Sequence, residues 1–169
     1  MYYQLRLDFK EALFGVEKTV NIESGSVKIK IPQGARDGME MRCTGKGMPG
    51  PENAPSGDLF ITFRVSYPDE FKVVGNDIYS IIEIGFDEAA LGTIVSVPTI
   101  DLSKTNGVST TKLKIPSGTQ YGTRFSIKGK GMPRVGTATQ GNVIVQVLIT
   151  IPKRLSKKQK KILQDYQNA

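Results

Sequence analysis

The chain has 169 residues, with 23 Lys and Arg against 16 Asp and Glu, one Cys and no His. The 38% hydrophobic and 23% charged content is typical of a globular protein and not of a disordered one. The absence of His excludes mechanisms that need an imidazole base, and one Cys cannot form an intrachain disulfide or a Cys-based zinc site. We therefore expect no imidazole-based catalysis and no cofactor in this chain.

Neither a membrane span nor a secretion signal is predicted. The longest weakly polar stretch, residues 89–100, is shorter than the roughly 20 apolar residues that a span needs. The N-terminal residues, MYYQLRL, have no basic region followed by an apolar one, as a signal peptide would. They alternate as a strand does, so the chain opens as an excised fragment would. We expect a reducing compartment, cytoplasmic or organellar, and no contact with a membrane.

The first half of the chain alternates apolar and polar residues, which predicts strands. The segment FKEALFG (9–15), like FDEAALG (86–92) in the second half, predicts one short helical turn, which ends at Gly15 or Gly92. The segments KTVNI (18–22) and VKIKI (27–31) predict a hairpin around the turn ESGS. Residues 59–65 alternate with a period of two, so one face of this strand is expected to be buried.

An internal repeat is the strongest feature of the sequence. Residues 27–68 align with residues 111–152 at an offset of 84 without a gap, and fourteen of the 42 pairs are identical. Upstream, LDFKEALFGVEKTV matches IGFDEAALGTIVSV at an offset of 77, so the second copy has seven extra residues at 101–107. The repeat predicts a mainly β fold of two tandem homologous β-sandwich domains, each with a short helix, followed by a C-terminal helix.

We place the first domain at residues 1–74, the second at 75–152, and a helix for dimerisation or docking at 153–169. The last segment carries a net charge of +5, which leaves +2 for the rest of the chain. Ser156 is the expected N-cap, and Ile162, Leu163 and Tyr166 lie on one side of the helix.

A helix of this length is marginal in isolation, so its apolar side is expected to pack on something. Six Lys and Arg side chains would crowd a two-fold axis. We therefore expect the tail to fold against residues 75–152, in a fragment that is a monomer or at best a weak homodimer.

Two motifs that suggest chemistry are better explained by structure. The segment GKGMPG (45–50) has the GxGxxG spacing, but PENAPSG after it cannot begin a helix and the second copy lacks the third glycine. We interpret Gly45 and Gly47 as glycines with positive φ in a turn. Cys43 has Ile127 as its repeat partner, which favours a buried small hydrophobic residue over a reactive thiol.

The acidic residues show no pairing suited to hydrolysis or to metal binding. Glu11 has Glu88 as its repeat partner, and Asp58 has Asn142. Positions of this kind usually cap turns.

The hairpin at residues 18–31 admits two interpretations. Val20 and Ile22 share one face of the first strand, and Val27 and Ile29 can share a face opposite them. This apolar face is either ordinary core or a trough open at a sheet edge, where an extended segment could add as a strand.

The repeat and the segments within it resemble the C-terminal substrate-binding region of DnaJ-type J-domain co-chaperones. The segments that carry the resemblance include LDFKEALFGVEKTV, VKIKIPQGARDG, FKVVGNDIY, FDEAALGTIVSVPTI and QGNVIVQVLITIPKRLSKKQKKIL. They cover essentially the whole chain in the family's order. The resemblance implies two β-sandwich domains and a C-terminal dimerisation helix. It also implies a protein that is not an enzyme, one that binds non-native polypeptides and delivers them to a DnaK-class heat-shock chaperone.

The resemblance further implies where clients and partner bind. The family's shallow apolar groove for an extended peptide falls here on Val20, Ile22, Val27, Ile29 and Phe71. Some relatives bind the acidic C-terminal tail of the partner chaperone at a basic site in the first domain. The nearest candidates for that site are Lys18 and Lys72.

The sequence departs from the family in two places. The J-domain signature His-Pro-Asp is absent, so this chain alone should not stimulate the partner's ATPase. Many members carry a cysteine-rich zinc region where ESGS stands here, so zinc is expected only in a full-length protein with that insert. GVEKTVNI is closer to the zinc-containing class, which favours an excised insert over a zinc-free class.

Two other classes of function remain as alternatives. A basic β-rich nucleic-acid-binding module would need cations and exposed aromatic residues interleaved on one sheet face. With most Phe residues at inward positions and a nearly neutral body, nucleic acid is the less favoured partner. A dimerising scaffold without peptide binding is the third reading.

Overall fold

The computed structural model describes residues 1–169, apart from the side chain of Asn53. The first half contains β1 (Tyr2–Leu7), α1 (Phe9–Phe14), β2 (Val16–Ile22), β3 (Gly25–Ile31), β4 (Glu40–Cys43), the 3-10 helix η1 (Pro51–Asn53) and β5 (Leu59–Val65). The second half contains β6 (Lys72–Val74), β7 (Asp77–Gly85), α2 (Phe86–Leu91), β8 (Thr93–Ile100), β9 (Val108–Ile115), β10 (Arg124–Ile127), β11 (Val143–Thr150) and α3 (Lys157–Gln167).

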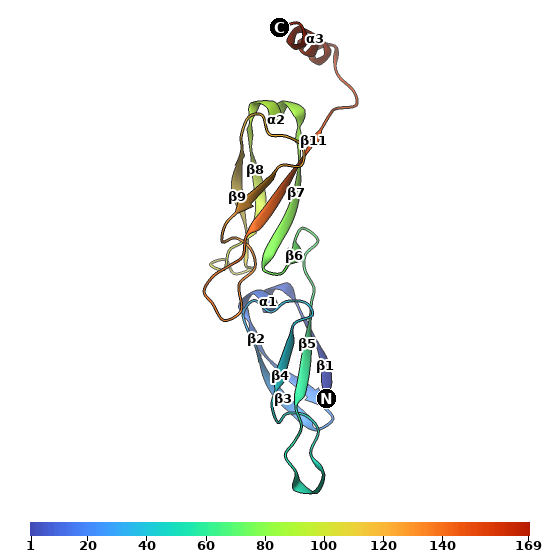
Figure 1. Cartoon of the computed structure of the whole chain (residues 1–169), viewed down its shortest axis with the longest axis vertical. Helices are drawn as coiled ribbons and strands as arrows, with labels where there is room; N and C mark the ends of the chain where they lie inside the picture. Colours follow the sequence, from blue (N-terminus) through green and yellow to red (C-terminus); the bar gives the residue numbers. More distant parts are fainter.

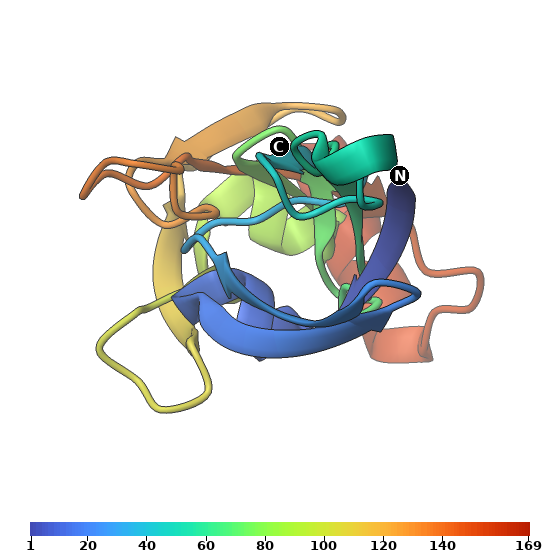
Figure 2. The same cartoon turned by 90° about the horizontal axis from the view of Figure 1, so that it is seen from below.

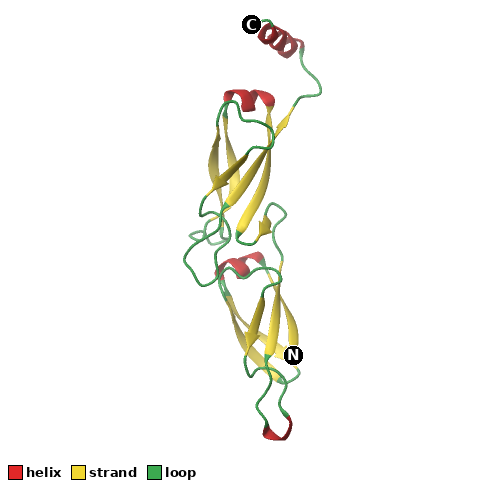
Figure 3. Cartoon of the chain, viewed as in Figure 1, coloured by secondary structure: helices red, strands yellow, loops and turns green.

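The two halves lie end to end in an elongated molecule (Figure 1). Each has a larger sheet, ordered β1-β5-β4 in the first half and β10-β11-β7-β6 in the second. A two-stranded sheet, β2-β3 or β8-β9, completes each half. A short helix caps the same end of each layered β unit (Figure 3), and the strands surround the long axis in the view from below (Figure 2). The mainly β fold predicted from the sequence is confirmed.

The sequence repeat is reproduced in the strand registers. Tyr2 lies beside Phe60 in the parallel pair β1–β5, and Tyr79 lies beside Ile144 in the parallel pair β7–β11. These partners differ by the same offsets of 77 and 84 that align the sequences. The seven-residue insertion is also confirmed, because residues 101–107 form the loop between the paired ends of β8 and β9.

Capping of the two short helices follows the repeat. The Glu11 carboxylate accepts a hydrogen bond from the Asp8 N–H at 2.9 Å, and the Glu88 carboxylate accepts one from Gly85 at the same distance. Gly15 and Gly92 end the helices with φ of 74° and 87°. Such positive φ values favour glycine, so the predicted ends of both helices are confirmed.

The GKGMP turn is capped in the same way in both halves. Asp58 accepts a hydrogen bond from the Gly45 N–H, and its repeat partner Asn142 accepts one from Gly129. Gly45 has the predicted positive φ of 68°. The prediction is wrong for Gly47, whose φ is not positive. A side chain there would instead lie 2.5 Å from the carbonyl oxygen of Asp58, so close backbone approach requires this glycine.

Cys43 is a half-buried free thiol that packs against the core of the first domain beside Met39 and Met41. Burial raises the pKa of this thiol. The thiolate is the reactive form of cysteine, so the environment agrees with a structural residue.

Three apolar clusters form the core. The first lies inside the first domain, around Phe63, Leu59 and Ile61. The third lies near α2, around Ile84 and Val147. The second cluster crosses between the domains, because Leu13 and Phe71 of the first share it with Val97, Ile100 and Met132 of the second.

Strand β6 lies where the sequence placed a domain boundary. It pairs with β7, with Val74 opposite Asp77, so a hairpin spans the expected division between residues 74 and 75. Residues 72–74 therefore belong to the sheet of the second half. The division into 1–74, 75–152 and 153–169 stays a prediction, but the sheets favour a boundary before Lys72.

Helix α3 stands away from the second domain at the end of an extended segment (Figure 1). None of its described residues is buried, and Ile162 and Tyr166 are 55% and 80% exposed. The expectation that the tail folds against residues 75–152 is therefore wrong. One apolar side is not enough to dock this helix, because the six Lys and Arg side chains of residues 153–161 favour exposure to water.

Candidate functional site

The four predicted site residues on the β2–β3 hairpin differ in how deeply they are buried. Val20 and Ile29 are buried in the core of the first domain. Ile22 and Val27 are half-buried and pack against the same cluster. Val20 lies directly opposite Val27 in the register. The four residues therefore share one face of the hairpin, and Ile22 and Val27, each nearer the turn on its own strand, are the two that a ligand can reach.

Phe71 lies apart from these four residues. Its ring stacks on Phe9 with centroids 5.5 Å apart, and Phe9 meets Tyr67 edge-on at 6.1 Å. Phe71 is buried in the cluster between the domains and not in the cluster of Val20. The structure therefore does not bring Phe71 together with the hairpin.

Lys18 is already held by groups of its own domain. Its ammonium forms an ion pair with Glu11 at 2.7 Å and donates a second hydrogen bond to the carbonyl oxygen of Arg6 at 3.4 Å. The Arg6 carbonyl belongs to β1, so Lys18 links β2 to β1. An acidic ligand at this site would have to compete with Glu11.

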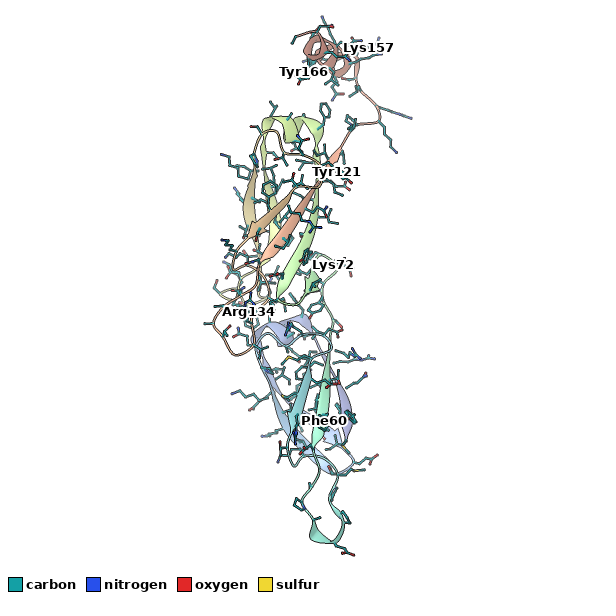
Figure 4. All side chains as sticks on the ribbon, in the orientation of Figure 1. Phe60, Lys72, Tyr121, Arg134, Lys157 and Tyr166 are labelled. Atoms are coloured by element: carbon teal, nitrogen blue, oxygen red, sulfur yellow. The ribbon has the colours of Figure 1, made fainter. Side chains whose placement is uncertain are left out.

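Lys72 lies elsewhere. It is exposed on β6, opposite Tyr79, at the place labelled in Figure 4. The two predicted basic residues therefore lie on different domains.

In the part of the chain that the structure describes, strands β1 and β2 of the first domain each have one free edge. Strand β1 is an edge strand of its sheet, and β2 pairs on one side with β3. Each strand consequently has an edge whose backbone groups lack a strand partner among the described residues. Tyr3 and Leu5 of β1 and Val20 of β2 pack in one apolar cluster, so the two strands share a core. An extended chain that paired with either free edge would meet unpaired backbone donors and acceptors.

A second hollow, of about 670 Å³, lies on the second domain and was not predicted from the sequence. Its apolar lining comes from Val74, Tyr79, Ile81, Ile82, Pro98 and Ile144. Arg124 and Lys72 contribute positive charge, and Asp69 and Glu70 contribute negative charge.

The sequence contained a signal for this hollow. Strand β7 is apolar on both faces, since Ile78 and Ile84 are buried while Tyr79 and Ile81 are exposed. A strand of this kind has apolar surface on its solvent side that a ligand can cover.

One surface combines aromatic rings with a cation, as a nucleic-acid site would. Tyr2 stacks on Phe60 with centroids 5.3 Å apart, and the Arg42 guanidinium lies 6.0 Å from the Phe60 ring. The charge of Arg42 is paired with Asp58 at 2.6 Å, however. This group of residues therefore lacks the free positive charge that binding to a phosphate backbone needs.

Among the described residues, no three His, Cys, Asp or Glu side chains gather as they would around a metal ion. Within the same part of the chain, none of the helices has both the length and the apolar character to cross a membrane.

Comparison with protein families gives one match. The model of the DnaJ C terminal domain matches residues 1–152. This range includes the two homologous halves and leaves out α3.

Several proteins named Chaperone protein DnaJ are similar to the chain. The one from Geobacillus thermodenitrificans is 44% identical over 140 residues, which cover 83% of this chain and 35% of that protein. The one from Clostridium novyi is 44% identical over 137 residues, with 81% and 35% covered. The one from Lysinibacillus sphaericus is 39% identical over 140 residues, with 83% and 36% covered. The chain thus spans about a third of the length of these relatives.

Proposed function

Because the chain belongs to the DnaJ C-terminal domain family, we propose that it binds non-native polypeptide as the client-binding part of a chaperone. Client delivery to a DnaK-class heat-shock chaperone is part of the same proposal, and so is a location inside the cell. The family is one of chaperones and not of enzymes. The absence of His from the chain, which excludes imidazole-based catalysis, agrees with this.

The free edges of β1 and β2, together with the half-buried Ile22 and Val27 on the hairpin, are the observation that carries this proposal. An extended client segment can add beside one of these edges through main-chain hydrogen bonds, which do not depend on the client's sequence. Its alternate side chains then contact Ile22 and Val27. Val20 and Ile29 are buried on the same face, each farther from the turn on its own strand, and Phe71 remains a proposed client contact at the junction between the domains. One or two apolar contacts of this size suit a micromolar affinity, about −8 kcal/mol.

Lys18 and Lys72 remain the proposed contacts for the acidic tail of the partner chaperone. Lys18 supports this role by its position between β2 and β1, where it donates to the Arg6 carbonyl. Its bond to Glu11 makes the interaction weak, because the tail must displace an existing carboxylate.

The test measures binding of a fluorescent, permanently unfolded polypeptide to the chain and to the double variant Ile22→Ser, Val27→Ser. Loss of two half-buried apolar side chains removes about 1–2 kcal/mol of binding free energy, so we expect roughly tenfold weaker binding. Val16→Ser is the matched control. Val16 is also half-buried, lies on the same face of β2, and is at the far end of the strand.

A second arm tests the main-chain hydrogen bonds. A peptide that binds the chain is compared with the same peptide methylated at alternate backbone nitrogens, which keeps its side chains but removes donors. Strand addition predicts that methylation abolishes binding. Unchanged affinity for the double variant would place the client elsewhere, and loss of binding in Ile81→Ser alone would move the site to the hollow of the second domain.

A further inference from the structure

The two domains differ most clearly at the seven residues 101–107, and this inserted loop lies against the helix of the other domain. A methyl group added to Gly107 would lie 2.5 Å from Cδ1 of Leu13 and 3.3 Å from the Phe14 ring. Leu102 and Val108, at the two ends of the loop, pack on the cluster that contains Leu13. The insertion in the second domain is therefore a contact surface for α1 of the first.

The inserted loop is stiff, because hydrogen bonds join its two ends. The Asp101 carboxylate accepts bonds from the N–H of Ser103 at 3.0 Å and from its hydroxyl at 2.6 Å. The Asp101 N–H donates to the Gly107 carbonyl, and the Gly107 N–H donates to Lys104, both at 3.0 Å. A loop closed in this way loses little further conformational entropy when it holds a neighbouring element.

The two helices differ as this contact requires. Leu13 of α1 is fully buried, whereas its repeat partner in α2 is the exposed Ala90. Phe14 packs on the same cluster, whereas its partner Leu91 is 82% exposed. Large apolar side chains are thus buried on the helix that the inserted loop covers.

A second close approach lies on the same junction. Gly34 and Gly118 are repeat partners with φ of 82° and 79°. A Cβ on Gly34 would collide with the carbonyl oxygen of Pro133 in the other domain, whereas one on Gly118 would meet nothing within 4 Å. The second domain therefore contacts the first at two places: the inserted loop lies against α1, and the segment around Pro133 lies against Gly34.

We propose that the inserted loop 101–107 is an interdomain clamp that fixes the orientation of the first domain relative to the second. The β2–β3 hairpin has a two-residue turn in its place and cannot reach a neighbour in this way. The clamp holds the two domains at a constant separation. This inference goes beyond the proposed function and stands whether or not either domain binds polypeptide.

The test replaces Asp101–Gly107 by the two-residue turn Asn-Gly, which suits a tight hairpin and retains the Ile100–Val108 pair. Nitroxide labels are placed at Lys28→Cys and Lys112→Cys, exposed repeat partners on β3 and β9, with Cys43→Ser in every form. Electron spin resonance then measures the distance distribution between the labels. We expect a narrow distribution with the loop and one at least twice as wide without it. Amide exchange protection within each domain should be unchanged.

A point variant gives an independent readout if the replacement disturbs the second domain. Gly107→Ala and Gly136→Ala introduce the same backbone strain, because both glycines have φ of 74°. A Cβ at Gly136 meets nothing within 4 Å. We expect Gly107→Ala to broaden the distance distribution and Gly136→Ala to leave it narrow. Equal distributions for these two variants, or an unchanged width after loop replacement, would overturn the proposal.

Discussion

Asp58 and Asn142 cap the same turn in the two domains with side chains of different charge. Both accept a hydrogen bond from the backbone N–H of the turn glycine, at 3.0 Å and 3.2 Å. Asp58 also accepts one from Arg42 at 2.8 Å. The bond from Gly45, followed by the one from Arg42, lowers the pKa of Asp58.

This difference predicts how Asp58→Asn changes stability with pH. A lowered pKa means that ionised Asp58 stabilises the folded state above its unfolded pKa of about 4. This stabilisation is lost as the pH falls through the lower folded value. Asp58→Asn keeps an acceptor for Gly45, as Asn142 demonstrates, so we expect a small loss of stability at pH 7 and a flatter stability profile below pH 4. Melting temperatures from pH 2 to pH 7 check this.

Asn142→Asp is the converse control. It adds a carboxylate to the second domain and should make acid unfolding steeper. If Asp58→Asn leaves the slope below pH 4 unchanged, Asp58 is not a source of the acid sensitivity.

Much of the structure at this scale was predictable from the repeat alone. A position occupied by Glu in both copies, as at residues 11 and 88, indicates a shared cap, and the structure confirms it. The role of Gly47 was not predictable. The repeat shows that glycine occupies this position in both copies. It does not show the reason, because the close contact with the Asp58 carbonyl depends on how the turn packs against the residues before β5.

The two short helices illustrate what a repeat cannot predict at the scale of elements. Both were predicted from FKEALFG and FDEAALG, and both form. Leu13 of α1 is buried because the inserted loop 101–107 lies against it, and among the described residues α2 has no such loop beside it. The same limit applies to Phe71, because the distance between Phe71 and Val20 follows from the packing of domains and not from the spacing in sequence.

The asymmetry of the helices predicts the cost of shortening one side chain in each. Leu13→Ala removes a fully buried side chain from the interdomain cluster, so we expect a loss of about 2–5 kcal/mol in the free energy of unfolding. Leu91→Ala makes the same chemical change at an exposed position, where the expected effect is within about 0.5 kcal/mol. Urea unfolding of the two variants gives the comparison.

Equal losses for the two variants would contradict the assignment of α1 to the junction. A loss confined to Leu13→Ala, with both domains unfolding together in the parent chain, would agree with one cooperative unit built around the shared cluster.

At the scale of the whole molecule, the domains share a core and α3 does not. The second cluster contains residues of both domains, so the two domains do not move independently of each other. Helix α3 meets the end of the second domain only across a hollow of about 530 Å³, whose apolar lining includes Phe86, Ile151, Leu155 and Ile162. The far position of Tyr166 is visible in Figure 4.

An eleven-residue helix with no buried side chain has little to stabilise it beyond its Ser156 cap, so α3 needs a partner to be fully formed. A second copy offers the same apolar side, Ile162 and Tyr166, but also brings six more Lys and Arg charges. We therefore expect a monomer at low micromolar concentration and a weak dimer above it.

Raising the ionic strength from about 0.05 M to 0.5 M should strengthen this dimer, because it screens the repulsion between the tails. Ile162→Ser should abolish the dimer, while Ile94→Ser, at an exposed position on β8, should not. Analytical ultracentrifugation over a range of protein and salt concentrations measures each of these, and a dimer that persists at nanomolar protein would show that α3 has a much better partner surface than its charge allows.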